Sequence, residues 1–157
     1  MSKSTRLNTK IAVVLYILID VICVGGGMGV PIFCILLGFP VGWYLAKKTY
    51  ISTDHSSLVF SKILKLSLLT TSFTFLLMVL VWGIWGRAIS MLLDPSSDFQ
   101  NFGHPFILYD PKASFIGWII LMIFISPFLQ LLTTIFASFI TVIRISKLEV
   151  IKEPYNQ

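Results

Sequence analysis

Charged residues are scarce in this sequence of 157 residues. Only 12% are Asp, Glu, Lys or Arg, about half the ~25% typical of soluble domains, while 56% are hydrophobic. A soluble fold of this length leaves about 30% of its surface in water and needs polar residues to cover that surface. The 12 basic and 7 acidic residues are too few for this purpose. The composition therefore excludes an ordinary soluble globular protein, a disordered protein and a nucleic-acid binder.

Cysteine and histidine are scarce as well. The two cysteines, Cys23 and Cys34, fall in apolar stretches, and no C-x-x-C motif is present. These counts exclude a disulfide-rich scaffold, a four-cysteine zinc site and the usual thiol–disulfide chemistry. Because both cysteines are equally far from the middle of the stretch 11–46, we expect them to be neighbouring buried thiols, with a disulfide as the alternative. The two histidines, His55 and His104, lie in polar segments.

Catalytic motifs are also absent. The sequence has no H-E-x-x-H, no G-x-S-x-G and no glycine-rich phosphate loop before a lysine. Asp94, Asp98, His104 and Asp110 fall in one polar stretch and offer side chains that can bind a divalent cation, but their spacing matches no EF-hand loop. We therefore predict a protein that is not an enzyme, with no catalytic residues, no metal and no cofactor.

The sequence does contain four apolar segments, at residues 9–25, 29–46, 65–86 and 114–143. As a helix, Leu66–Gly86 spans about 31 Å, close to the hydrocarbon thickness of a bilayer. Phe115–Ile143 would span about 43 Å, so it must tilt, kink or project, and Pro127 gives a cause for a kink. The segments lack the alternation of barrel strands. They predict an all-α, polytopic integral membrane protein: a four-transmembrane-helix bundle forming a single membrane domain over residues 1–157, with an outer loop at 87–113.

The stretch 11–46 leaves several arrangements open. It can form one long helix, a hairpin that crosses twice, or a re-entrant hairpin. Gly25–Gly29 disfavours a continuous helix, and Pro31 favours the first turn of a new one, so we expect a hairpin that turns near Gly27. A cleaved signal peptide is a further alternative, although Asp20 interrupts its apolar run and no A-x-A site follows.

The basic residues indicate the orientation. If all four segments cross, ten of the twelve Lys and Arg fall on one side, and the loop 87–113 keeps only Arg87 and Lys112. The positive-inside rule then places both termini in the cytoplasm, and we expect the plasma (inner) membrane. The net charge of +5 therefore reflects orientation and does not indicate an acidic partner. Ala88–Leu93 is expected to form one apolar turn at the outer interface.

Apart from Lys10 and Lys65 at the ends of their segments, Asp20 is the one charged residue inside a predicted span. Counted from Lys10 it lies about 15 Å deep, where an aspartate costs about 2.5–3.5 kcal/mol on insertion scales. Thr74, Gln130 and Thr134 reach a similar depth, so we predict an intramembrane polar cluster of Asp20, Thr74, Gln130 and Thr134. With no Lys, Arg or His at this depth, we expect a protonated Asp20 that is hydrogen-bonded to one of the other three. The cluster serves either to hold helices together or to couple protons or cations.

Small and hydroxylated residues recur every three or four positions in the third and fourth segments, and two glycines have the same spacing in the second. Such faces let membrane helices approach closely. We therefore predict helix-packing positions at Gly38, Gly42, Ser67, Thr71 and Ala137. We expect the polar faces of the third and fourth helices to meet, with Thr71 near Ala137. A hydrophilic substrate path along the faces of the third and fourth helices is the alternative. For Gly38 and Gly42, with Pro40 between them, the alternative is a kink or an unwound segment.

Two functions follow from these observations. The first is a non-enzymatic interaction or accessory subunit of a membrane assembly, whose partners are the lipid bilayer and either a second copy or another membrane protein. The second is a small oligomeric transporter or channel that uses Asp20 for proton or cation coupling. Four helices leave little room for a path within one protomer, so transport would require a second copy.

Overall fold

The structure is a computed structural model that describes residues 9–26, 32–51, 56–85, 87–99 and 110–152. Throughout these residues the regular structure is helical, in the order α1 (Thr9–Gly26), α2 (Ile32–Ile51), α3 (Ser56–Met78), η1 (Val79–Trp85), α4 (Ala88–Leu93), α5 (Pro111–Ile120), η2 (Leu121–Ile125) and α6 (Ser126–Lys152). The segments η1 and η2 are π-helical; η1 continues α3, and η2 joins α5 to α6 without a break. The predicted all-α class is confirmed, and the expected turn at Ala88–Leu93 is the short helix α4.

Within the described residues, two helical runs are long and apolar enough to cross a membrane, judged by length and composition. They are Leu58–Trp85, with 28 residues, and Pro111–Leu148, with 38 residues. Both are longer than the sequence indicated. The first run belongs to a helix that begins at Ser56, whereas we expected a span of 65–86, and the second extends well beyond 114–143.

Both extensions have a local cause. Lys62 and Lys65 are good helix formers on exposed positions, so they lengthen α3 instead of ending it. At the start of α5, the Asp110 side chain accepts a hydrogen bond from the Lys112 N–H at 3.1 Å, and Pro111 occupies the first turn. Polar residues that end an apolar segment in the sequence therefore do not end the helix.

The stretch 11–46 forms two helices, which excludes the single long helix. α1 ends at Gly26 and α2 begins at Ile32, while the expected turn near Gly27 lies outside the described residues. α2 continues as a helix through Pro40. α1 and α2 contact each other, which agrees with the expected hairpin.

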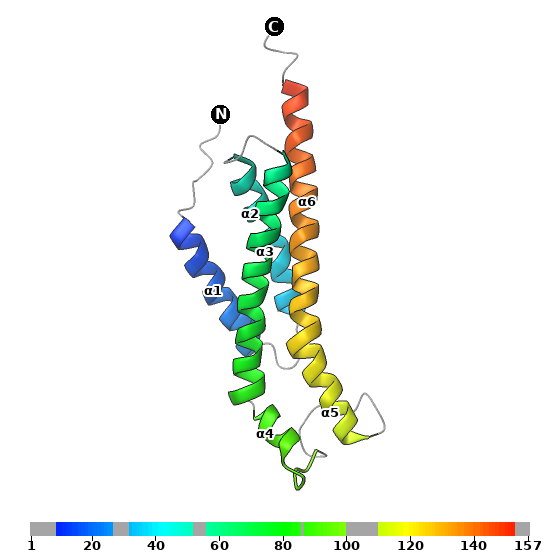
Figure 1. Ribbon diagram of the computed structural model, residues 1–157. Coiled ribbons are helices and arrows are strands. Elements are labelled where there is room, and N and C mark those ends of the chain that lie inside the picture. Colours follow the sequence, from blue (N-terminus) through cyan, green and yellow to red (C-terminus); the bar gives the residue numbers. More distant parts are fainter. Residues whose placement is uncertain (1–8, 27–31, 52–55, 86, 100–109, 153–157) are drawn as a thin grey trace.

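The long run from α5 to α6 bends at the expected place. Pro127 has no N–H, and its ring crowds the carbonyl four residues earlier, at Ile123. The π-helical segment η2 lies immediately before this proline and widens the backbone there. Figure 1 shows the result, because α5 leans away from the line of α6.

Three long helices pack along one another, and the fourth is more loosely attached. α2, α3 and α6 contact each other, with the most extensive contact between α2 and α6. α1 contacts α2 and α3 to a smaller extent. In Figure 1 the first turns of α1 stand away from the other helices, and its last turns approach them.

Two apolar clusters lie in the interior. One consists of Ala46, Val59, Ile63 and Val142. The other, which we call the Val24 cluster, has Val24, Cys34 and Met78 at its centre, with Cys23, Leu77, Val81 and Trp82 packed against it. Cys23 and Cys34 are therefore close in space, and both are free thiols.

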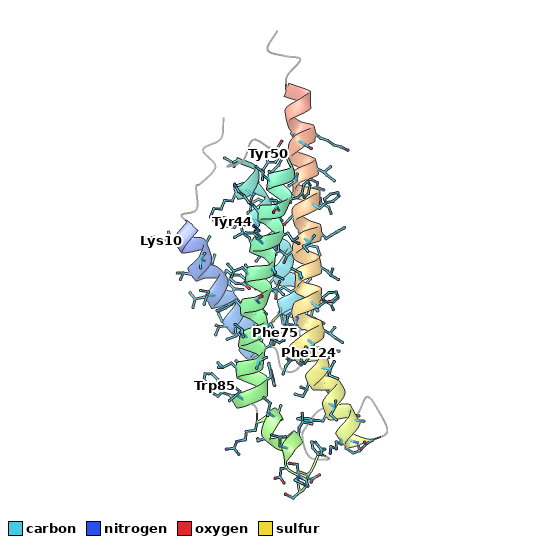
Figure 2. All side chains as sticks on the ribbon, viewed as in Figure 1. Lys10, Tyr44, Tyr50, Phe75, Trp85 and Phe124 are labelled. Atoms are coloured by element: carbon cyan, nitrogen blue, oxygen red, sulfur yellow. The ribbon has the colours of Figure 1, made fainter. Side chains whose placement is uncertain are left out.

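Polar side chains are also buried in the described part of the interior. Seven of them are at most 1% exposed: Asp20, Ser67, Thr74, Ser126, Gln130, Thr134 and Ser138. Large apolar side chains meanwhile cover the outside, as Figure 2 shows for the length of the molecule. This is the reverse of the distribution in soluble proteins, where polar residues are mostly exposed.

Candidate functional site

α1 is docked along a single stripe. Tyr16, Asp20 and Val24 are spaced by four residues and therefore share one face of the helix. Asp20 and Val24 are buried and Tyr16 is half-buried, whereas Leu18 and Ile22 are 56% and 68% exposed. The only charged side chain in the interior part of α1 thus lies in the middle of its contact face.

Asp20 is hydrogen-bonded to α3. The Thr74 hydroxyl donates to Asp20 Oδ2 at 2.9 Å, and the Tyr16 hydroxyl lies 3.5 Å from the same oxygen. The Tyr16 hydroxyl is also 2.9 Å from Thr74 Oγ1 and 2.9 Å from the Thr70 carbonyl oxygen. Each hydroxyl has one hydrogen, so these short distances describe alternative hydrogen bonds within one continuous chain.

Gln130 connects α6 to the same group of side chains. Its side chain lies beside the Tyr16 hydroxyl, and the residue is 1% exposed. Among the described residues, neither Gln130 Oε1 nor Asp20 Oδ1 has a hydrogen-bond partner. We call the set Tyr16, Asp20, Thr70, Thr74 and Gln130 the Asp20 network. It offers two buried acceptors and joins three helices.

The predicted polar cluster is brought together only in part. Asp20, Thr74 and Gln130 are members of the Asp20 network. Thr134 is buried but donates to the Gln130 carbonyl of its own helix at 2.7 Å. Sequence reasoning missed Tyr16, although its position four residues before Asp20 was a usable signal.

The glycines of α2 face α6. A Cβ atom at Gly38 would meet Thr133 Oγ1 and would lie 2.7 Å from the Gln130 carbonyl oxygen. A Cβ atom at Gly42 would meet the Thr134 carbonyl and would lie 3.0 Å from Ala137 Cβ. Only a residue without a side chain allows the two backbones to approach this closely.

Hydroxyls of α6 strengthen the same contact. Ser138 donates to the Gly42 carbonyl at 2.9 Å, and Thr133 donates to the Ile35 carbonyl at 2.8 Å. The small and polar face of α6 is therefore directed at α2 as well as at α3, which was the partner we expected. On α3, Ser67 and Thr71 are buried as expected, and within the described part of the chain their hydroxyls have no partner.

A groove separates the first turns of α1 from α2. It has a volume of about 220 Å³ and is lined by α1 from Ala12 to Ile19 and by α2 from Leu37 to Leu45. We call it the α1–α2 groove. Its walls are apolar, and Tyr16 and Thr70 bring the Asp20 network to its surface.

Two acidic residues between α4 and α5, Asp94 and Asp110, have local roles. Asp94 accepts hydrogen bonds from the Ser96 hydroxyl at 2.6 Å and from the Ser96 N–H at 2.9 Å, and these bonds lower its pKa. Asp110 caps α5. In the described part of the chain no three His, Cys, Asp or Glu side chains form a metal site, and His104 lies outside it.

The site therefore consists of a buried carboxyl, hydroxyl groups and an amide that are joined across three helices. No family model matches the chain, and no curated protein or solved structure is significantly similar to it. Its function is inferred from its own side chains.

Proposed function

We propose that the chain is an integral membrane protein in which α1, α2, the run α3–η1 and the run α5–α6 cross the bilayer as a four-helix bundle. The distribution of polarity supports this, because polar side chains are buried and large apolar ones are exposed. In the apolar windows of the two longest runs, only 28% and 33% of the residues are buried. A core helix of a soluble protein would be mostly buried, whereas lipid covers such exposed apolar faces.

The positions of the charges support cytoplasmic termini. The first turn of α1 and the last turns of α2 and α6 lie at one end of the molecule (Figure 1), and that end carries Lys10, Lys47, Lys48, Arg144 and Lys147. The opposite end of the described structure has Arg87 and Lys112. By the positive-inside rule, the first end faces the cytoplasm and the protein belongs to the plasma (inner) membrane.

Within that membrane the protein acts as a non-enzymatic interaction or accessory subunit. The main support for this role is that α1 contacts the other helices along the stripe of Tyr16, Asp20 and Val24. This contact leaves an apolar groove and a wide apolar surface within the bilayer. Membrane helices associate by close packing of such surfaces. The partner is another membrane protein, and a second copy of the chain is the alternative.

Photo-crosslinking in native membranes tests this role. A photoreactive residue at Val41, inside the α1–α2 groove, should give one adduct of defined protein mass. The same residue at Leu69, which is 67% exposed on α3, should react only with lipid. Lipid adducts alone at Val41, together with a monomer in native mass spectra of the purified chain, would contradict the accessory role.

The second candidate function is ion-coupled transport by an oligomer. It is favoured by the buried carboxyl of Asp20, because ionisable residues in spans usually mark ion or proton pathways. Asp20→Asn keeps the size and most hydrogen bonds of the side chain but cannot titrate. A coupling role predicts that the variant folds and loses proton- or cation-linked flux in vesicles, whereas unchanged flux would contradict it.

A further inference from the structure

The surroundings of Asp20 differ on its two sides along α1. One turn before it, Tyr16 lines the α1–α2 groove, and one turn after it, Val24 lies at the centre of the Val24 cluster. One side therefore leads to a groove and the other to packed apolar side chains. Asp20 itself is 0% exposed, so any exchange with solvent requires a path through its neighbours.

The groove side provides a hydrogen-bonded path. Tyr16 lines the groove, its hydroxyl lies 2.9 Å from Thr74 Oγ1, and Thr74 lies 2.9 Å from Asp20 Oδ2. The groove begins at Ala12, about 3 Å along the helix from Lys10. The first turns of α1, which line the groove, stand away from the other helices (Figure 1), so the groove lies toward the end that we propose is cytoplasmic.

The opposite side is closed. Val24 and Met78 are each 1% exposed, and Cys34 is fully buried between them. The Trp82 indole N–H donates to the Val24 carbonyl at 3.3 Å, which fixes the large ring over this cluster. Apolar packing of this kind excludes water and offers no hydroxyl to carry a proton further.

Among the described residues, the ionisable groups near enough to interact with the charge of Asp20 are Tyr16 and Cys23 of α1 and Cys34 of α2. In the described structure α3 and α6 present hydroxyl and amide groups to it, and the nearest basic residue of α6, Arg144, is about 21 Å along the helix from Gln130. Lys10 is about 15 Å along α1 from Asp20, and Lys65 is about 14 Å along α3 from Thr74. Within the described residues, a negative charge on Asp20 therefore has no nearby cation to balance it.

We propose that Asp20 is a proton-binding site that exchanges with the cytoplasmic side only, through the chain Tyr16–Thr74–Asp20. This inference rests on the second candidate function and names its ion and its route. A proton from cytoplasmic water binds the Tyr16 oxygen while Tyr16 passes its own hydrogen to Thr74 Oγ1. Thr74 passes its hydrogen to Asp20 Oδ2, so one O–H bond forms and one breaks at each hydroxyl, and the carboxylate becomes a neutral acid.

Infrared spectroscopy of the full chain in lipid vesicles tests the proposal. The carbonyl band of protonated Asp20 is assigned by its loss in Asp20→Asn. On transfer to D₂O, this band should shift faster than the backbone amides of the spans exchange. Tyr16→Phe should slow the shift at least about tenfold, because a phenyl ring packs like tyrosine but carries no exchangeable hydrogen. Tyr44→Phe is the matched control, since Tyr44 lines the same groove from α2 and should leave the rate unchanged.

Several results would overturn the proposal. They are an Asp20 band that is absent at neutral pH, a wild-type band that exchanges as slowly as the amides, or an unchanged rate in Tyr16→Phe. If circular dichroism shows that Tyr16→Phe does not fold, the exchange rate of the Asp20 band is compared between Thr74→Ser and Thr74→Val. Only Thr74→Ser keeps the hydroxyl, so only this variant should keep the fast exchange; equal rates would overturn the proposal. Crosslinking at Val41 does not depend on proton binding by Asp20, so it tests the accessory role independently of this proposal.

Discussion

Asp20 is surrounded by groups that can form hydrogen bonds to it but cannot neutralise it. Thr74 and Tyr16 contact Oδ2, whereas Oδ1 has no partner in the described structure. Gln130 Oε1 is a second buried acceptor without a partner there. At the residue scale, the Asp20 network therefore has more acceptors than hydrogens when Asp20 is ionised, and a proton on the carboxyl reduces that deficit.

The stability of Asp20 variants separates hydrogen bonding from charge. Asp20→Asn retains an acceptor for Thr74 and supplies donor hydrogens, so it should unfold at nearly the wild-type denaturant concentration. Asp20→Leu removes the acceptor of a buried hydroxyl and should cost about 1–2 kcal/mol. Reversible unfolding in mixed micelles measures both. An Asn variant that is less stable than the Leu variant would show that the charge, not the hydrogen bonds, holds α1.

Asp94 allows a pH prediction outside the spans. The Ser96 hydroxyl and N–H hold the pKa of Asp94 below its usual range of about 3.9. A lowered pKa means that the turn is stabilised above the usual value and loses that contribution as pH falls through the lowered one. Ser96→Ala removes the hydroxyl donor and should raise the pKa of Asp94 toward normal in an NMR titration, whereas an unchanged value would assign the effect to the N–H alone.

At the scale of elements, α2 is held to α6 by close backbone contact. Gly38→Ala and Gly42→Ala each place a methyl group against carbonyl oxygens of α6, which cannot move aside like flexible side chains. Each should destabilise the fold by about 1–3 kcal/mol. Gly117→Ala in α5 is the matched control, because nothing lies within 4 Å of its added methyl group, and it should be neutral or stabilising by up to about 1 kcal/mol.

Unfolding curves of the three glycine variants in one detergent check this ranking. Equal stability of Gly42→Ala and Gly117→Ala would show that α2 and α6 are not in tight contact in solution.

Hydropathy predicted the helices because few other structures are compatible with an apolar run that is long enough to cross a bilayer. The helix α3 begins before the predicted span of 65–86, since Lys62 and Lys65 can keep their charges in water while their stems lie along a helix. The contact of α2 with α6 was missed for a different reason. Chain order suggested α3 as the partner of α6, but Gly38 and Gly42 let α2 approach more closely.

Depth along the helices predicted part of the site. Counting from the basic ends placed Asp20 and Thr74 at one level, and the structure places them 2.9 Å apart. Depth does not give the direction of a side chain, and the Thr134 hydroxyl turns to the carbonyl of its own helix. Tyr16 was overlooked because a tyrosine counts as apolar in hydropathy, although its hydroxyl connects Asp20 to the groove.

At the scale of the whole molecule, the arrangement combines a firm part and a looser one. α2, α3 and α6 pack along one another, whereas α1 is attached by the stripe from Tyr16 to Val24. Both proposed functions depend on this difference, because the groove beside α1 is the surface for a partner and the entrance to Asp20. They also depend on the orientation of the chain, since a cytoplasmic groove requires a cytoplasmic N-terminus.

Cysteine labelling of intact cells tests that orientation. In a background where Cys23 and Cys34 are replaced by serine, an impermeant thiol reagent should modify a reporter at Ser97, in the loop between α4 and α5. It should spare reporters at Ser4, Thr53 and Asn156, because the basic residues place these positions inside. Labelling at Thr53 from outside would overturn the four-span topology.

A reporter at Met28 addresses the remaining alternative for α1 and α2. This position falls between the two helices, far from the lysines at their other ends. If both helices cross, Met28→Cys is at the outer face and should react with the external reagent, as Ser97→Cys does. If the hairpin is re-entrant, Met28→Cys ends within the bilayer and stays unreactive, while Thr53→Cys is still protected.

Lysed cells provide the control, since Thr53→Cys must react once the reagent reaches the cytoplasmic face. Reaction at Met28 in intact cells with protection at Thr53 would establish two crossings, and with them the cytoplasmic groove that leads to Asp20.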